Sequence, residues 1–195
     1  MAELEIDFLS GAIAHRLKYG GGKGQTLPKA IGMKIDKEPK VIDATAGLGR
    51  DAFLLASLGA KVTMIERSKA IYEKLFLAMQ RAREQGGDIA KIIANMQLIH
   101  GDAKRLIPTL NPEIILIDPM HPERKKSALV KQEMRFLREI VGTDDDASEL
   151  INIALKFAKK RVVLKWPQNA TLPKDIRPPS HQIRGKTTRY DVFMI

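Results

Sequence analysis

The chain has 195 residues, of which 44% are hydrophobic and 29% are charged, as is typical of a single globular domain with its own core. Because it contains no Cys, disulfide bonds, thiolate metal sites and cysteine nucleophiles are excluded, and we expect a protein of the reducing cytoplasm. No apolar run approaches the roughly 18 residues that cross a bilayer, and the acidic N-terminus does not resemble a secretory signal. We therefore expect a soluble protein without a membrane partner.

The formal net charge is +10, and it is unevenly distributed along the chain. Residues 1–10 carry −3, residues 11–40 carry +5, residues 41–120 carry +1 and residues 121–195 carry +7. The positive excess thus lies in two segments that flank a nearly neutral centre. A polyanionic partner such as nucleic acid explains this pattern, and a merely basic soluble protein explains the charge equally well.

The first 40 residues form a basic segment that precedes the predicted core. A Gly-rich stretch at 19–24 predicts a loop, and residues 26–31 predict a short helix with Pro28 in its first turn. A regular alternation then starts, and it runs as strand 40–44, helix 51–58, strand 61–66 and helix 68–83, the last with Ser68 as its N-cap.

The alternation continues through the rest of the chain as strands 96–100 and 113–118, helices 128–141 and 148–158, and strands 161–165 and 188–195. Strands that alternate with helices predict a parallel sheet covered by helices on both faces, and right-handed crossovers make it doubly wound. We therefore expect one α/β domain over residues 1–195, with ligands at the carboxyl ends of the strands.

Polar residues follow the first four predicted strands. Asp43 begins a turn that contains Gly47, Gly49, Arg50 and Asp51, where the glycines permit a tight turn and the next helix offers unpaired backbone N–H groups. Asp43 itself either contacts a ligand or accepts hydrogen bonds from the amides of the turn.

Acidic residues also end the next three strands. Glu66 ends the second strand, where an acid can accept both hydroxyls of a ribose. Asp102 follows Gly101 at the end of the third strand, where a carboxylate can meet an adenine amino group. The fourth strand ends in Asp118-Pro119-Met120-His121.

A dinucleotide-binding site is one explanation of this arrangement. Gly47-x-Gly49-x-x-Ala52 satisfies the dinucleotide fingerprint, and Glu66 follows Gly47 at the expected distance. A pyrophosphate would, however, lie against the negative charge of Asp51. A nicotinamide dehydrogenase would also assign no function to Asp118-Pro119-Met120-His121. The dehydrogenase is therefore the weaker alternative.

Longer strings of the sequence resemble one family of S-adenosylmethionine-dependent methyltransferases. DATAGLGRDAF, LASLGAKVTMIER, LIHGDA, LIDPMHPERKKSALVKQEMR and KRVV with Lys165 are similar to the bacterial guanine-N2 methyltransferases of small-subunit (16S) ribosomal RNA, J type. The resemblance runs from about Phe8 through Tyr190. Members usually carry a further N-terminal segment that this sequence lacks, and their Asp-Pro-Met-Phe is Asp-Pro-Met-His here.

The resemblance implies a Rossmann-like class I fold, with a mostly parallel sheet and an antiparallel C-terminal strand. It implies S-adenosylmethionine as cofactor and small-subunit ribosomal RNA as partner. The cofactor-binding positions that we infer from the strand ends and from the resemblance together are Asp43, Gly47, Gly49, Arg50, Asp51, Glu66, Arg67, Asp102, Ala103 and Asp118.

The expected catalytic group consists of Asp118, Pro119 and His121. The exocyclic N2 of guanine is a poor nucleophile because its lone pair is delocalised into the ring. Hydrogen bonds from the amino group to the Asp118 carboxylate and the Pro119 carbonyl would hold it for attack, and either Asp118 or water takes the proton. His121 stacks on the base or faces solvent, and no metal is required.

Basic residues outside the predicted cofactor site are candidates for RNA contact: Lys18, Lys23, Arg124, Lys125, Lys126, Lys131, Arg135 and Arg138. The alternative to RNA contact is that these residues lie in a solvated loop or on a solvated helix face. Trp166 either stacks on a base or packs at the rim of the core. Two further functions remain open at this point: methylation of another amino group, such as adenine N6, and RNA binding without catalysis.

Overall fold

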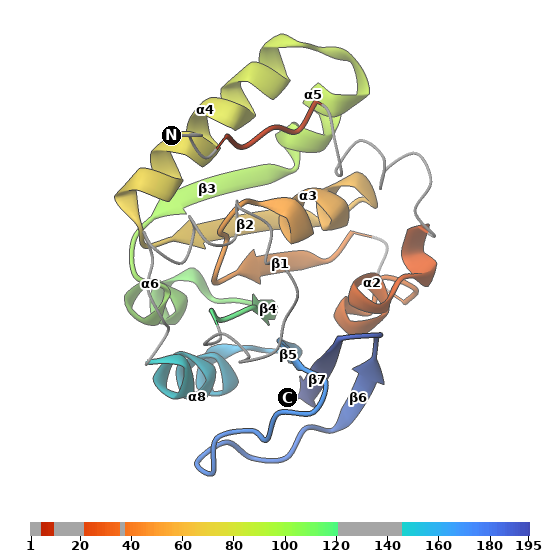
Figure 1. Ribbon diagram of the computed structural model, residues 1–195, viewed down its shortest axis with the longest axis vertical. Helices are drawn as coiled ribbons and strands as arrows, with labels where there is room; N and C mark the ends of the chain where they lie inside the picture. Colours follow the sequence, from red (N-terminus) through yellow and green to blue (C-terminus); the bar gives the residue numbers. More distant parts are fainter. Residues whose placement is uncertain (1–4, 10–21, 36–37, 121–145) are drawn as a thin grey trace.

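The computed structural model describes residues 5–9, 22–35, 38–120 and 146–195, and a seven-stranded sheet passes through this part of the chain (Figure 1). The strands are β1 (Lys40–Asp43), β2 (Lys61–Glu66), β3 (Met96–His100), β4 (Ile114–Ile117), β5 (Arg161–Pro167), β6 (His181–Arg184) and β7 (Thr188–Met194). Their order is β3-β2-β1-β4-β5-β7-β6. Strands β1 to β5 pair in parallel, whereas β7 is antiparallel to both of its neighbours.

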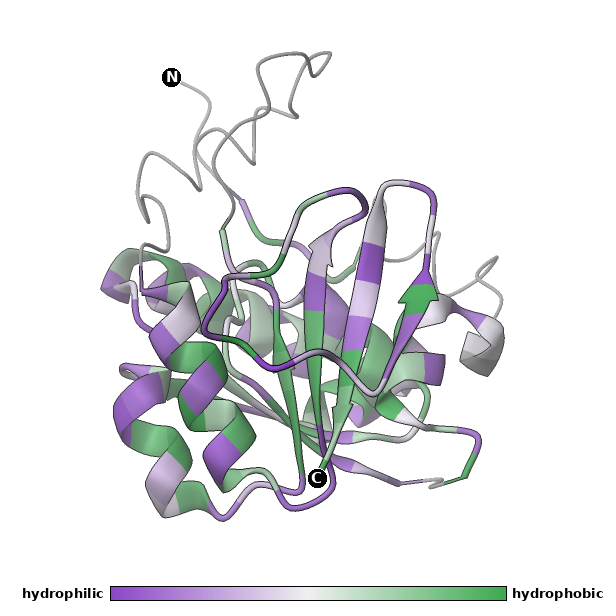
Figure 2. Cartoon of the chain, turned by 90° about the horizontal axis from the view of Figure 1, so that it is seen from below, coloured by the Kyte–Doolittle hydropathy of each residue, from purple (hydrophilic) through white to green (hydrophobic). Residues whose placement is uncertain are grey.

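Helices cover both faces of this sheet. They are α2 (Thr26–Ile31), α3 (Arg50–Ser57), α4 (Lys69–Glu84), α5 (Gly87–Ala94), α6 (Ala103–Leu110) and α8 (Ala147–Phe157), with a 3-10 turn, η1, at Gly22–Gly24. Residues of α2 to α5 form one core cluster with Val41 and Leu116, and residues of α6 and α8 form another with Ile42 and Ile115. Because side chains alternate along a strand, each central strand fills both cores. Figure 2 shows the hydrophobic residues concentrated along these strands.

The order of the parallel strands reverses at β1, because β2 and β3 lie on one side of it and β4 lies on the other. The turns after β1 and β4 therefore diverge at the carboxyl ends, which is where doubly wound sheets bind ligands. Gly49 closes the turn after β1 with a φ of 69°, and a Cβ there would lie 2.9 Å from a methyl carbon of Leu75. The position is thus restricted to glycine by conformation and by space.

Residues 5–9 pack beneath this turn. The ring of Phe8 stacks on that of Phe53 in α3, with centroids 4.9 Å apart, and Arg81 of α4 donates a hydrogen bond to the Ile6 carbonyl. These contacts anchor the segment before the sheet against two helices. Among the helices of the described residues, none is both long enough and apolar enough to cross a membrane.

The structure confirms the predicted strands and adds elements that the sequence did not predict. Helices α5 and α6 and the edge strand β6 lie in stretches for which the sequence predicted neither helix nor strand. The helix expected at 128–141 lies outside the described residues. Ser68 occupies the N-cap position of α4 but makes no side-chain cap. Its backbone N–H donates to Glu66.

Candidate active site

A cavity opens at the carboxyl ends of the parallel strands, with about 610 Å³ of empty space when the part open to solvent is included. Its lining comes from the turns after β1, β2, β3 and β4 and from the start of α8. Six of the predicted site residues meet here: Gly47, Glu66, Arg67, Asp102, Ala103 and Asp118.

Glu66 joins the first two turns of the site. Its side chain is buried at the end of β2, where one carboxylate oxygen accepts the N–H of Gly47 at 2.9 Å and the other accepts the N–H of Ser68 at 2.8 Å. A carboxylate can accept about four hydrogen bonds, so these bonds are compatible with acceptance of ligand hydroxyls. Glu66 therefore shapes the glycine turn as well as lining the cavity.

Asp102 occupies the N-cap position of α6. Its side chain accepts the N–H of Lys104 at 2.9 Å, which satisfies one of the N–H groups that the first turn of a helix leaves unpaired. Ala103 follows as a buried residue of the same turn. The cap fixes the orientation of Asp102 beside the cavity, and its contact with an adenine stays a prediction.

Charged side chains form an ion-pair cluster at the α8 side of the cavity. Asp146 pairs with Arg67 at 3.2 Å and with Lys104 at 2.8 Å, and Lys104 also pairs with Glu149 at 2.7 Å. The hydrogen bond from Lys104 lowers the pKa of Asp146, and the bonds to Asp146 and Glu149 raise the pKa of Lys104. The family resemblance pointed to Arg67 but not to Lys104 or Asp146. Asp146 does precede a predicted helix, and acids are favourable near a helix N-terminus.

A second charged group lies beside the cavity and centres on Lys165 of β5. The Lys165 Nζ donates to Asp51 Oδ2 at 2.8 Å and to Asp118 Oδ2 at 2.7 Å. Asp118 is also held through its backbone, because its N–H donates to the Thr45 hydroxyl at 2.7 Å. Burial alone would lower the pKa of Lys165, but the carboxylates of Asp118 and Asp51 outweigh it and raise this pKa.

Asp43 is the most enclosed carboxyl of this group, with 3% of its surface exposed. It accepts the N–H of Thr45 at 3.2 Å, which is the turn contact that the sequence allowed for. Burial raises the pKa of Asp43 to about 7, and the carboxylates of Asp51 and Asp118 act in the same direction. The hydrogen bond from Thr45 and the charge of Lys165 oppose this rise.

The remaining predicted residues lie in several places. Arg50 and Asp51 begin α3 and are not among the lining residues of the cavity, and neither is Gly49. Pro119 is buried directly after Asp118. His121 and the basic residues Lys18, Arg124, Lys125, Lys126, Lys131, Arg135 and Arg138 lie outside the described residues, as does the side chain of Lys23.

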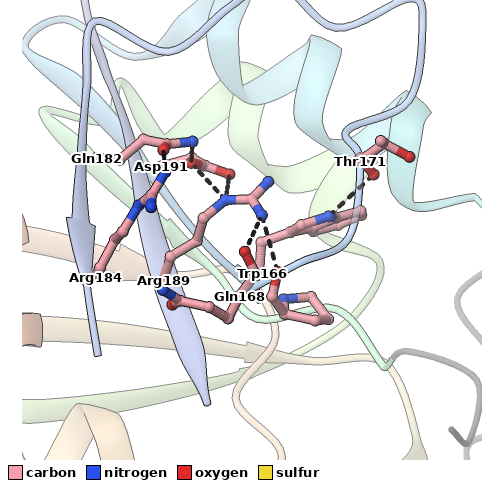
Figure 3. Close-up of polar contacts among 8 residues, drawn as sticks. Trp166, Gln168, Thr171, Gln182, Arg184, Arg189 and Asp191 are labelled. Atoms are coloured by element: carbon pink, nitrogen blue, oxygen red, sulfur yellow. Dashed lines mark hydrogen bonds and ion pairs between the residues drawn. The ribbon is translucent and has the colours of Figure 1, made fainter. Parts of the chain in front are cut away.

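Trp166 belongs to the core rather than to an open surface. Only 7% of it is exposed, and its Nε1 donates to the Thr171 carbonyl at 3.2 Å (Figure 3). This placement favours the packing role over stacking on a base. In the described part of the chain, no group of His, Asp and Glu side chains is arranged to hold a metal ion.

Comparison with known proteins decides the family. A family model described as "Putative SAM-dependent methyltransferase" matches residues 1–195. The chain is 56% identical to the Ribosomal RNA small subunit methyltransferase J of Brucella anthropi, over 99% of this chain and 94% of that protein. It belongs to this methyltransferase family. The corresponding protein of Agrobacterium fabrum is 57% identical, over 97% of this chain and 91% of that protein.

Solved structures of methyltransferases share the fold of this chain. A SAM-dependent methyltransferase from Neisseria gonorrhoeae is 34% identical, with a TM-score of 0.78 over 100% of this chain and 75% of that one. An RNA methyltransferase from Salinibacter ruber, in complex with S-adenosylhomocysteine, shares the fold at 14% identity and a TM-score of 0.53, over 87% of this chain and 89% of that one. The fold is thus the Rossmann-like methyltransferase fold, and the family uses S-adenosylmethionine. This assignment leaves the nicotinamide dehydrogenase without support.

Proposed function

We propose that the chain methylates the exocyclic N2 of a guanine in small-subunit ribosomal RNA. The names of its relatives support the RNA substrate. The observation that carries the proposal is the position of Asp118, which lines the cavity at the end of β4 while its carboxylate and its backbone are both held by the neighbouring turns. An oriented acceptor beside a cofactor cavity is what an amino group requires for attack on a methyl donor.

The cavity residues fit the cofactor. The buried carboxylate of Glu66 would accept the ribose hydroxyls, and Asp102 would meet the adenine amino group from the next strand end. Arg67, Ala103 and Gly47 of the first turn complete the proposed contacts. The bound cofactor supplies a methyl group on a positively charged sulfonium.

Asp118 and Pro119 would hold the target base. The amino group would donate one N–H to the Asp118 carboxylate and the other to the Pro119 carbonyl, which favours a pyramidal nitrogen with its lone pair directed at the methyl group. Both acceptors also offset the positive charge that develops on the nitrogen. His121 is proposed as the residue that stacks on the base.

The RNA itself would be held by the basic residues that flank the core: Lys18, Lys23, Arg124, Lys125, Lys126 and Lys131. Such residues contact phosphates and position the strand without reading its sequence. The target base has to leave its stack to reach Asp118, so contacts on both sides of it favour the extruded conformation.

Transfer of a labelled methyl group to purified small subunits, followed by digestion to nucleosides, tests the proposal. We expect the label in N2-methylguanosine. Label in N6-methyladenosine would contradict the guanine assignment and show that the protein methylates the amino group of adenine. RNA binding without any transfer would instead indicate a binding module and contradict the proposed catalysis.

A further inference from the structure

Lys165 connects two carboxylates that come from different parts of the fold. Asp51 lies in the first turn of α3, after β1, and Asp118 follows β4. The parallel register pairs Ile117 with Leu164, so Asp118 and Lys165 are the next residues along the two neighbouring strands. The 2.7 Å distance from Lys165 Nζ to Asp118 Oδ2 follows from this register, and Asp51 Oδ2 approaches the same Nζ at 2.8 Å from the first turn of α3.

We propose that Lys165 is a positioning residue for methyl transfer. It fixes the direction of the Asp118 carboxylate and keeps that carboxylate ionised, and Asp51 holds the lysine in place from the other side. This inference rests on the proposed role of Asp118 as acceptor of the target amino group. Lys165 acts through Asp118 and is not assigned a contact with the cofactor or the base.

The arrangement around Lys165 restricts its movement. About a quarter of the side chain is exposed, and an ammonium with two carboxylate partners has little freedom to leave either one. The strand end is held as well, because Arg189 donates to the carbonyls of Pro167 and Gln168 at 2.9 Å each (Figure 3). Arg189 is in turn paired with the fully buried Asp191.

Charge gives the second part of the argument. Asp51 from α3 and Asp118 after β4 both raise the pKa of Asp43 in β1, as like charges at short range disfavour ionisation. Lys165 supplies the positive charge that compensates them. Without it, a proton on one of the carboxyls becomes more favourable, and a protonated Asp118 would donate a hydrogen bond where the reaction needs an acceptor.

The test compares the pH dependence of methyl transfer in the wild type, Lys165→Met and Lys165→Arg, with small subunits as substrate. We expect Lys165→Met to lower kcat by about 10–100-fold, as for other residues that orient a catalytic group, and to change the affinity for S-adenosylhomocysteine by less than about 3-fold. The acid limb of its pH profile should move to higher pH, so that part of the activity returns as the pH rises. Lys165→Arg should restore most of kcat.

The control is Lys160→Met, because Lys160 precedes the same strand and pairs with Glu113 at 2.6 Å. We expect the Lys160→Met variant to have the same pH profile as the wild type. A Lys165→Met protein whose kcat falls equally at every pH, or whose cofactor affinity falls in step with kcat, would overturn the inference. If Lys165→Met does not fold, Lys165→Gln takes its place. An acid limb of the Lys165→Gln pH profile that matches the wild type would also overturn the inference.

The two proposals fail in distinguishable ways. If the wild type methylates another base, the guanine assignment fails, and the comparison of pH profiles is made on that product. If the wild type produces N2-methylguanosine and the Lys165 variants match it in kcat and pH profile, only the positioning role is refuted.

Discussion

At the scale of single residues, Glu66 has a structural role in addition to its proposed role in binding the cofactor. Its carboxylate accepts two backbone N–H groups, from Gly47 and from Ser68, so removing it affects the turn and the ligand together. This was not visible in the sequence, where Glu66 is only an acid at a strand end. Substitutions of Glu66 therefore have to be measured for stability and for binding.

We expect Glu66→Ala to weaken binding of S-adenosylhomocysteine by roughly 1.5–3 kcal/mol, the range for hydrogen bonds to a charged group. The same variant should lower the free energy of unfolding, because the N–H groups of Gly47 and Ser68 lose their acceptor. Calorimetric titration and urea unfolding measure the two effects. Glu73→Ala removes an exposed acid of α4 and serves as the control. Unchanged affinity in a folded Glu66→Ala protein would remove Glu66 from the cofactor site.

Asp118→Asn is expected to slow methyl transfer by a factor on the order of 10²–10⁴ while the cofactor still binds. The amide keeps the shape of the side chain but lacks the charge that offsets the developing positive nitrogen. Single-turnover transfer to small subunits measures the rate, and titration with S-adenosylhomocysteine measures binding. A wild-type rate would mean that the carboxylate serves the structure alone.

Asp43 gives a prediction about pH. The pKa of its carboxyl is about 7 in the folded protein against an ordinary value of 3.8, so between these values the folded chain holds a proton that the unfolded chain has released. The free energy of unfolding therefore falls as the pH rises through this window, and the decrease is complete above it.

Asp43→Asn should remove this dependence, because the amide is neutral at every pH and its oxygen still accepts the Thr45 N–H. We expect the variant to gain about 2–4 kcal/mol over the wild type between pH 4 and pH 8. Urea unfolding at several pH values measures the difference. Parallel pH profiles for the two proteins would show that the Asp43 carboxyl is ionised throughout.

At the scale of elements, the strands were predictable because parallel strands buried on both faces are continuous apolar runs. Helices α5 and α6 were not, since α5 begins at Gly87 directly after Gly86 and α6 contains Pro108, and both features are typical of loops. The edge strand β6 has the sequence His-Gln-Ile-Arg, which lacks a pattern typical of a strand. This segment forms a strand through its pairing with β7.

The candidate site was predictable to a similar extent. Glu66, Asp102 and Asp118 follow strands, and parallel strands bring their ends together, so their meeting could be inferred from order alone. The partners of Lys165 and Asp146 depend on the register of β5 and on where α8 starts, and neither is encoded locally. The sequence therefore predicted Glu66, Asp102 and Asp118 but not the ion pairs that Lys165 and Lys104 make.

The hairpin of β6 and β7 contains a buried ion pair that we expect to be important for stability. Arg189 is 6% exposed and Asp191 is fully buried, and Gln182 donates to Asp191 at 2.6 Å (Figure 3). Asp191→Ala leaves Arg189 buried without its counter-charge, and we expect the free energy of unfolding to fall by about 3–5 kcal/mol. Urea unfolding measures it.

The control for this prediction is Asp88→Ala, which breaks an exposed pair with Lys91 and should change stability very little. A destabilisation by Asp191→Ala no larger than that of the control would mean that water replaces the missing carboxylate.

At the scale of the whole molecule, the nearly neutral segment 41–120 supplies most of the residues that line the cavity, and the flanking segments carry the positive charge. We expect RNA affinity to fall steeply with salt, because each bound phosphate releases counterions. Replacement of Lys125, Lys126 and Lys131 by Ala should reduce the slope of log affinity against log salt by roughly 0.7–0.9 for each phosphate that the variant no longer binds. Binding of S-adenosylmethionine should be unaffected. Parallel lines at equal affinity would show that these lysines face solvent in the complex.

The most direct test of the account is mass mapping of methylated guanines in small-subunit ribosomal RNA from cells with and without this protein. We predict that one N2-methylguanosine disappears when the protein is absent, returns with the wild-type gene and does not return with the Asp118→Asn gene. An unchanged set of N2-methylguanosines in cells that lack the protein would contradict the proposed activity.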